Sequence, residues 1–93
     1  MNISKNQYKH LVNVDLINSY LLLNNLTKND FCKKLKIDKK LLNKILKRKL
    51  DYVPFCLWDI AENIGVDIKN LINGKLILKY NLKVFEKDSF LIH

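Results

Sequence analysis

The 93-residue chain has few of the residues that build phosphate-binding loops, metal sites and catalytic sets. It contains only two glycines, which excludes the glycine-rich loops that hold nucleotide phosphates. Two cysteines, Cys32 and Cys56, stand far apart, and the two histidines, His10 and His93, lie near opposite ends, so the clustered ligands of a zinc site are missing. No serine, histidine and aspartate set at a recognised spacing occurs. We therefore expect neither an enzyme nor a metal or cofactor site.

Long hydrophobic runs and an export signal are also missing. No apolar run reaches the roughly 18 to 20 residues of a membrane span. The first ten residues, MNISKNQYKH, are polar and lack the apolar segment of a secretion signal. We expect a protein of the cytoplasm with no membrane association, in which both cysteines are small buried thiols.

Positive charge, by contrast, is abundant and concentrated. The net charge is +8, and residues 28–49 alone hold ten Lys or Arg against two acids, so this segment accounts for the whole excess. A codon bias toward lysine would have spread these residues along the chain. A concentrated basic patch is instead typical of a protein that binds a polyanion.

Apolar residues recur at helical spacing through most of the chain and predict a mainly helical bundle. Residues that favour helix starts precede several of these segments, namely Asp15, Thr27, Asp38 and Asp67, and Pro54 fits the first turn of another. Gly65 and Gly74 are expected to end helices. The predicted helices cover 15–24, 28–36, 38–48, 54–64 and 68–73.

The third predicted helix, 38–48, has one apolar and one polar face. The apolar face is expected to pack in the core and consists of Leu41, Leu42, Ile45 and Leu46. The polar face points outward and consists of Lys39, Lys40, Asn43, Lys44 and Lys47.

The two ends of the chain are predicted to be extended. Residues 76–85 alternate apolar and polar side chains, which favours a strand, and FLI at 90–92 could return as a second one. Residues 8–14 could also be extended and pair with that strand. Three segments result: an N-terminal extension over 1–14, a helical unit over 15–74 and a β appendage over 75–93.

Two leucines, Leu22 and Leu23, widen the apolar surface of the first helix. They are expected either to make an extra core contact with the terminal strands or to belong to a dimer interface that includes residues 76–92. The sequence leaves both interpretations open.

The run LTKNDFCKKLKIDKKLLNKILK, followed by VPFCLWDIAENIGVDIKNLI, resembles the helix-turn-helix domain of the lambda repressor and Cro type. The likeness covers about residues 15–73. It implies a mainly α, five-helix, lambda repressor-like bundle that contains a helix-turn-helix, here with a short C-terminal β-strand or hairpin. The residues that match the family pattern are Leu26, Thr27, Phe31, Cys32, Ile37, Asp38, Leu42, Ile60 and Ala61.

The chain departs from the family pattern at three positions. Lys36 stands where the family often has glycine, so the turn must be made with a side chain present. Leu21 and Leu46 stand where relatives commonly carry an Arg and a Glu that pair inside the fold. Replacing both charges by leucine is a coherent exchange, because apolar packing can substitute for a buried ion pair.

The resemblance implies that this chain is a sequence-specific regulator of transcription, a repressor that inserts helix 38–48 into the major groove of double-stranded DNA as a homodimer. The residues expected to face base edges are Lys39, Lys40, Asn43 and Lys44. The residues expected to face the phosphate backbone are Lys28, Lys47, Arg48 and Lys49. Two alternatives stay open: an ordinary solvated face for the lysines, and an antitoxin or adaptor that uses the same fold to hold a protein partner, with DNA binding as autoregulation.

Overall fold

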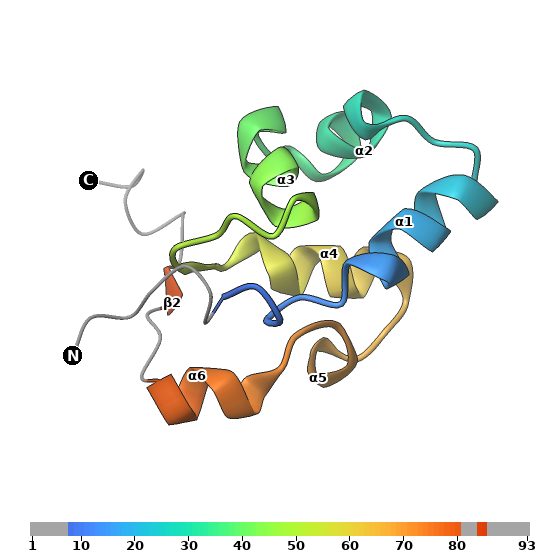
Figure 1. Ribbon diagram of the computed structural model, residues 1–93. Coiled ribbons are helices and arrows are strands. Elements are labelled where there is room, and N and C mark those ends of the chain that lie inside the picture. The colour runs from blue at the N-terminus through green and yellow to red at the C-terminus, as the bar shows by residue number, and fades with distance from the viewer. Residues whose placement is uncertain (1–7, 81–83, 86–93) are drawn as a thin grey trace.

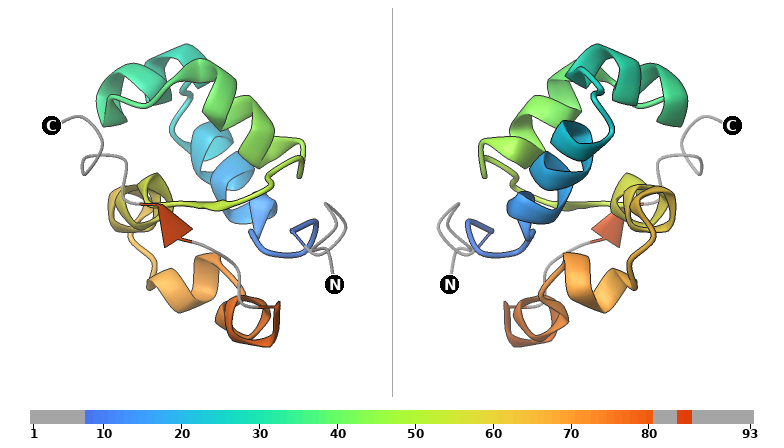
Figure 2. Two further views of the ribbon diagram at one scale, coloured as in Figure 1. Left: turned by 90° about the vertical axis from the view of Figure 1, so that its left-hand side faces the viewer. Right: turned by 90° about the vertical axis from the view of Figure 1, so that its right-hand side faces the viewer.

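The computed structural model describes residues 8–80 and 84–85, which form a small helical bundle with one short pair of strands (Figure 1). Helix α4 crosses the middle of the molecule, with α2 and α3 on one side of it and α5 and α6 on the other (Figures 1 and 2). No helix in the described ranges is both long and apolar enough to cross a membrane. The helices are α1 (Val14–Leu23), α2 (Lys28–Leu35), α3 (Lys39–Leu46), α4 (Cys56–Ile64), α5 (Ile68–Leu71) and α6 (Gly74–Tyr80). The strands β1 (Val53–Pro54) and β2 (Val84–Phe85) are parallel.

A single apolar core holds the helices together. Among the described residues, every buried side chain belongs to an apolar residue type or to tyrosine, and no charged side chain is buried. Phe31 of α2 and both Leu42 and Ile45 of α3 are 0 % exposed. Each such side chain contributes about 1.5–3 kcal/mol on burial. Because these anchors lie on the inner faces of α2 and α3, the outer faces of the two helices are left for solvent.

Helix α1 begins one residue earlier than predicted. The residue that precedes it is Asn13, which makes no side-chain capping bond, and Asp15 lies inside the first turn. The prediction of Asp15 as the N-cap is therefore wrong. The start is set by tertiary contacts, because Val14 is buried in the core and the Asn13 amide donates to the carbonyl of Leu71 at 2.7 Å.

The N-terminal segment, residues 8–13, packs against the bundle. Val12 forms an antiparallel bridge with Ile72, and the Asn73 amide donates to the carbonyl of Leu11 at 2.7 Å. Leu11 is fully buried and Val12 nearly so. The extended conformation is confirmed at Val12, but its partner is the α5–α6 connection rather than the predicted strand at 76–85.

The strand predicted over 76–85 is wrong for its first half, because residues 76–80 belong to α6. Asn73 accepts a hydrogen bond from the Lys75 amide at 3.2 Å through its side chain, which is how asparagine favours a helix start. Gly74 therefore begins a helix instead of ending the previous one. Leu76 and Ile77 are adjacent and both half-buried, which an alternating strand would not allow.

The second half of the predicted strand, near residues 84–85, is extended but pairs with a different segment. Val84 and Phe85 are extended, and they pair in parallel with Val53 and Pro54 rather than in a hairpin. Pro54 consequently lies in β1 and not in the first turn of α4, which starts at Cys56. The predicted return strand at 90–92 lies outside the described residues.

Candidate nucleic-acid interface

The start of α2 is fixed by a reciprocal pair of hydrogen bonds between Thr27 and Asp30. The Thr27 hydroxyl accepts from the Asp30 amide at 3.0 Å, and the Asp30 carboxylate accepts from the Thr27 amide at 3.1 Å. The bond from the Thr27 amide is the main reason that the pKa of the Asp30 carboxyl lies below its ordinary value, and the Thr27 side chain lowers it further. This capping box places Lys28 at the first position of the helix.

The turn between α2 and α3 is made by Lys36, Ile37 and Asp38. Lys36 adopts the left-handed conformation, with φ 57° and ψ 42°, so the turn is made with a side chain where glycine is favoured, as predicted. Ile37 is buried, and its amide donates to the carbonyl of Cys32 at 3.1 Å. The Asp38 carboxylate accepts from the Lys40 amide at 3.2 Å, which starts α3 at Lys39.

Helices α2 and α3 approach each other through small and apolar side chains. Cys32 is 8 % exposed and belongs to the same core cluster as Phe31, Leu42 and Ile45. Burial is the main reason that the pKa of the Cys32 thiol is raised, with a further contribution from the Asp38 carboxylate. This packing fixes the angle between the helices and hence the shape of their outer surface.

A shallow groove, which we call the α2–α3 groove, runs between the start of α2 and the outer face of α3. Four of the eight residues predicted to contact DNA come together there. The sequence did not single out Thr27 and Asn29 as groove residues; the only signal for them was their place beside the predicted helix start. The lining residues are Thr27, Lys28, Asn29, Lys39, Asn43 and Lys47.

The polar face of α3 carries two rows of side chains. Lys39, Asn43 and Lys47 are four residues apart and line the groove, with Asn43 half-buried. Lys40 and Lys44 form the neighbouring row and are exposed. In the described part of the chain, the only carboxylate within ion-pair distance of a lysine is that of Asp67, 3.8 Å from Lys69 in α5. No acid of this part therefore pairs with the α3 lysines.

The charges at the start of α3 oppose the helix dipole. Lys39 and Lys40 lie in the first turn, and that turn contains no acid. Cations at a helix N-terminus are unfavourable by about 0.3–1 kcal/mol each, because the amide groups there carry partial positive charge. These lysines therefore do not stabilise α3. An anion bound beside them would remove the repulsion.

Lys49 is exposed just beyond α3, whereas Arg48 differs from the other predicted contacts. Arg48 is half-buried, and its guanidinium donates to the carbonyl oxygens of Lys9 and Val12, both at 3.2 Å. Its side chain is thus directed toward the protein's own N-terminal segment and away from the α2–α3 groove.

Two other cations of the basic segment 28–49 lie away from the α2–α3 groove. Lys34 and Lys36 line a second groove with the carboxylates Asp59 and Glu62 of α4. The Lys34 ammonium also lies 5.9 Å from the centre of the Tyr20 ring and 3.4 Å from its hydroxyl. Among the described residues, the basic segment therefore divides into an α3 groove that no acid lines and a second groove where the cations face Asp59 and Glu62.

No protein-family model, curated protein or solved structure matches this chain. Within residues 8–80 and 84–85, no group of three or more His, Cys, Asp or Glu side chains could hold a metal ion. The interpretation of the site therefore depends on its own geometry and charge.

Proposed function

We propose that this chain is a sequence-specific, double-stranded DNA-binding regulator in which α2 and α3 act as a helix-turn-helix of the lambda repressor and Cro type. The observation that carries the proposal is the face of α3, where exposed lysines surround the half-buried Asn43 and pair with no carboxylate among residues 8–80 and 84–85. An α-helix fits the width of the major groove, and the first turns of a recognition helix meet the bases.

Each residue type on α3 suits a part of the DNA. Lys39, Lys40 and Lys44 can donate to O6 and N7 of guanine or to O4 of thymine. The amide of Asn43 has the paired donor and acceptor that match adenine. Lys28, at the start of α2, is next to amides that have no partner within the helix, a combination that favours a phosphate.

The groove also suits the backbone on either side of the bases. Lys47 lines it at the end of α3, and Lys49 follows as an exposed cation. Each phosphate neutralised by such a side chain makes log affinity fall by about 0.9 per decade of salt concentration. We therefore propose that binding is steeply salt-dependent, and that the regulator acts as a repressor by occupying an operator.

Equilibrium binding of paired double variants tests the proposal. Lys40→Ala with Lys44→Ala removes two charges from the outer face of α3. The matched control, Lys34→Ala with Lys36→Ala, removes two charges from the same basic segment at positions that face α4. Both variants lower the net charge by two, so they separate base contacts from overall electrostatic attraction.

Fluorescence anisotropy on a duplex selected from a random pool by the parent chain is the measurement. A base-directed contact is worth about 1–3 kcal/mol, so the α3 variant should bind about 30-fold more weakly or worse, since each 1.4 kcal/mol is about tenfold. The control variant should lose only the small part of the affinity that depends on net charge. Equal losses in the two variants would show that α3 does not read the bases.

A second candidate, an antitoxin or adaptor that holds a protein partner, is favoured by the end of α1. Leu22 and Leu23 are 82 % and 83 % exposed, so the predicted extra core contact is not made. The homodimer stays a prediction, and most of the residues assigned to its interface, 76–92, lie outside the described ranges. Light scattering of the parent and of a Leu22→Gln, Leu23→Gln variant separates a self-associating chain from one whose leucines await a different partner.

A further inference from the structure

Arg48, the second residue after α3, has an unusual backbone for its type. Arg48 is in the left-handed region, with φ 60°, directly after Lys47. Its amide donates to the carbonyl of Ile45 at 3.2 Å, and the next amide, of Lys49, donates to the carbonyl of Lys44 at 2.9 Å. This pattern of bonds is the Schellman motif, whose left-handed position is normally occupied by glycine. An arginine there is strained.

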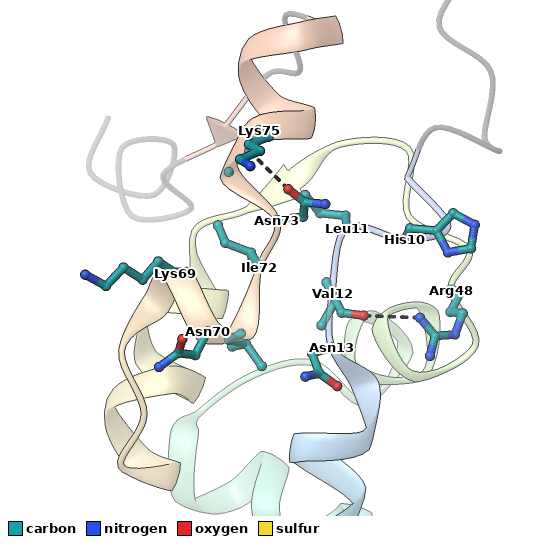
Figure 3. A pocket seen from close by; sticks show the side chains of 12 residues that line it. His10, Leu11, Val12, Asn13, Arg48, Lys69, Asn70, Ile72, Asn73 and Lys75 are labelled. Carbon is teal, nitrogen blue, oxygen red and sulfur yellow. Dashed lines mark hydrogen bonds between the residues drawn. The ribbon is translucent and has the colours of Figure 1, made fainter.

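The Arg48 side chain makes hydrogen bonds that offset this strain. The Arg48 guanidinium donates to two carbonyl oxygens, those of Lys9 and Val12, each at 3.2 Å, and Figure 3 shows the bond to Val12. Hydrogen bonds from a charged donor are stronger than neutral ones. A glycine at position 48 would have relieved the backbone but could not have made either bond.

The segment that receives these bonds is itself held firmly. Leu11 and Val12 are 0 % and 4 % exposed. On its other side the segment exchanges hydrogen bonds with the α5–α6 connection, from the Asn13 amide to Leu71 and from the Asn73 amide to Leu11, both 2.7 Å. Figure 3 shows the two backbones side by side, with Arg48 next to the N-terminal one. The end of α3 is therefore tied to a fixed part of the bundle.

We propose that Arg48 is a positioning residue for DNA binding rather than a phosphate contact: it sets the orientation of α3 by joining its C-terminal end to residues 9–12. This inference rests on the proposed function, since it takes α3 as the recognition helix. A binding element must be held to within about 0.5 Å and 10–20° of its productive geometry by its supporting contacts. A guanidinium with two protein acceptors has to break those bonds before it can reach a phosphate.

Two substitutions of Arg48 and one control separate the two roles. Arg48→Gly keeps the left-handed backbone and removes the guanidinium, and Arg48→Lys keeps a charged donor. Lys47→Ala removes an exposed cation that lines the α2–α3 groove and is proposed to contact a phosphate. All chains are measured at a temperature where denaturation curves show them fully folded, so that a loss of affinity is not a loss of folded protein.

The first measurement is hydrogen exchange without DNA. We expect the amides of Asn13 and Asn73 to exchange at least about fivefold faster in Arg48→Gly than in the parent, because local opening sets the exchange rate of such amides. The second is the salt dependence of affinity for the duplex that the parent chain selects from a random pool. We expect Arg48→Gly to bind about three- to tenfold more weakly with the parent's slope, and Arg48→Lys to recover part of the loss.

Lys47→Ala should instead reduce the slope of log affinity against log salt by about 0.9. If Arg48→Gly reduces the slope by the same amount while exchange at Asn13 and Asn73 is unchanged, Arg48 is a phosphate contact and the inference is wrong. Unchanged affinity in the fully folded Arg48→Gly chain would also overturn it, since Arg48 would then only stabilise the fold. If the parent chain selects no duplex, the proposed function is wrong. If the parent chain binds its duplex and Arg48→Gly gives one of the two contrary results just described, only the role of Arg48 is wrong.

Discussion

The left-handed turn at Lys36 allows a stabilising substitution. An L-amino acid pays about 1–2 kcal/mol to adopt this conformation, because its Cβ crowds the following carbonyl oxygen. Glycine does not have that cost. It loses more conformational entropy on folding, however, which lowers the free energy of unfolding by about 0.4–1 kcal/mol. The Lys36 side chain is exposed and donates no hydrogen bond among the described residues. We therefore expect Lys36→Gly to raise the free energy of unfolding by about 0.5–1 kcal/mol.

Thermal and urea denaturation followed by far-ultraviolet circular dichroism measure this change. For a chain of this size, 1 kcal/mol corresponds to about 4–8 °C in Tm, so the gain should be readily resolved. Lys36→Ala is the matched control, because it removes the same side chain and keeps the backbone cost. Asn25→Gly is a second comparison: Asn25 is also left-handed, with φ 54°, but asparagine tolerates this region better and should gain less.

The decisive comparison is between glycine and alanine at position 36. A Lys36→Gly chain that is no more stable than Lys36→Ala would mean that the turn is not left-handed in solution. The geometry that brings α2 and α3 together would then need to be revised, and the α2–α3 groove with it.

The remaining predictions concern the cap and the core of α2. Thr27→Ala should lower the free energy of unfolding by about 1 kcal/mol, measured by urea denaturation. Hydrogen bonds from Thr27 hold the pKa of the Asp30 carboxyl below its ordinary value of 3.8 in the folded chain. The carboxylate therefore stabilises the fold above pH 3.8, and this stabilisation is lost as the pH falls through the lowered pKa. The Asp30→Asn chain should lack this pH dependence of the free energy of unfolding. Cys32→Leu should destabilise by about 1–3 kcal/mol through overpacking, whereas Cys32→Ala should cost about 1 kcal/mol. A Cys32→Leu chain as stable as the parent would mean that α2 and α3 are loosely packed. The raised pKa and burial of the Cys32 thiol predict slow alkylation in the folded chain compared with the urea-unfolded chain.

Local patterns predicted α2 and α3 well because the determinants of these helices lie close together in the sequence. Thr27 and Asp30 are three residues apart, and Asp38 bonds an amide two residues away. The same locality misled the prediction at 76–80. Its alternating pattern was outweighed by the cap at Asn73, a local signal that the prediction missed, and by packing of Leu76 against the core.

The candidate site divides in the same way. The rows of lysine on α3 follow from helical periodicity, so Lys39, Asn43 and Lys47 were grouped correctly on one face. The partners of Arg48 are 36 and 39 residues away, and no local pattern reports such a contact. Charge counting likewise could not distinguish Lys34, which faces the acids of α4, from the lysines that face solvent alone.

The packing of residues 8–13 against the bundle determines where the chain can be truncated. A recombinant fragment cut at Val14, the first residue of α1, would retain all six described helices yet discard Leu11 and Val12, which fill the interior, and the acceptors of Arg48. Water would reach the space beneath α3. A fragment that keeps the core whole has to include Tyr8, which is only 6 % exposed, even though no helix starts there.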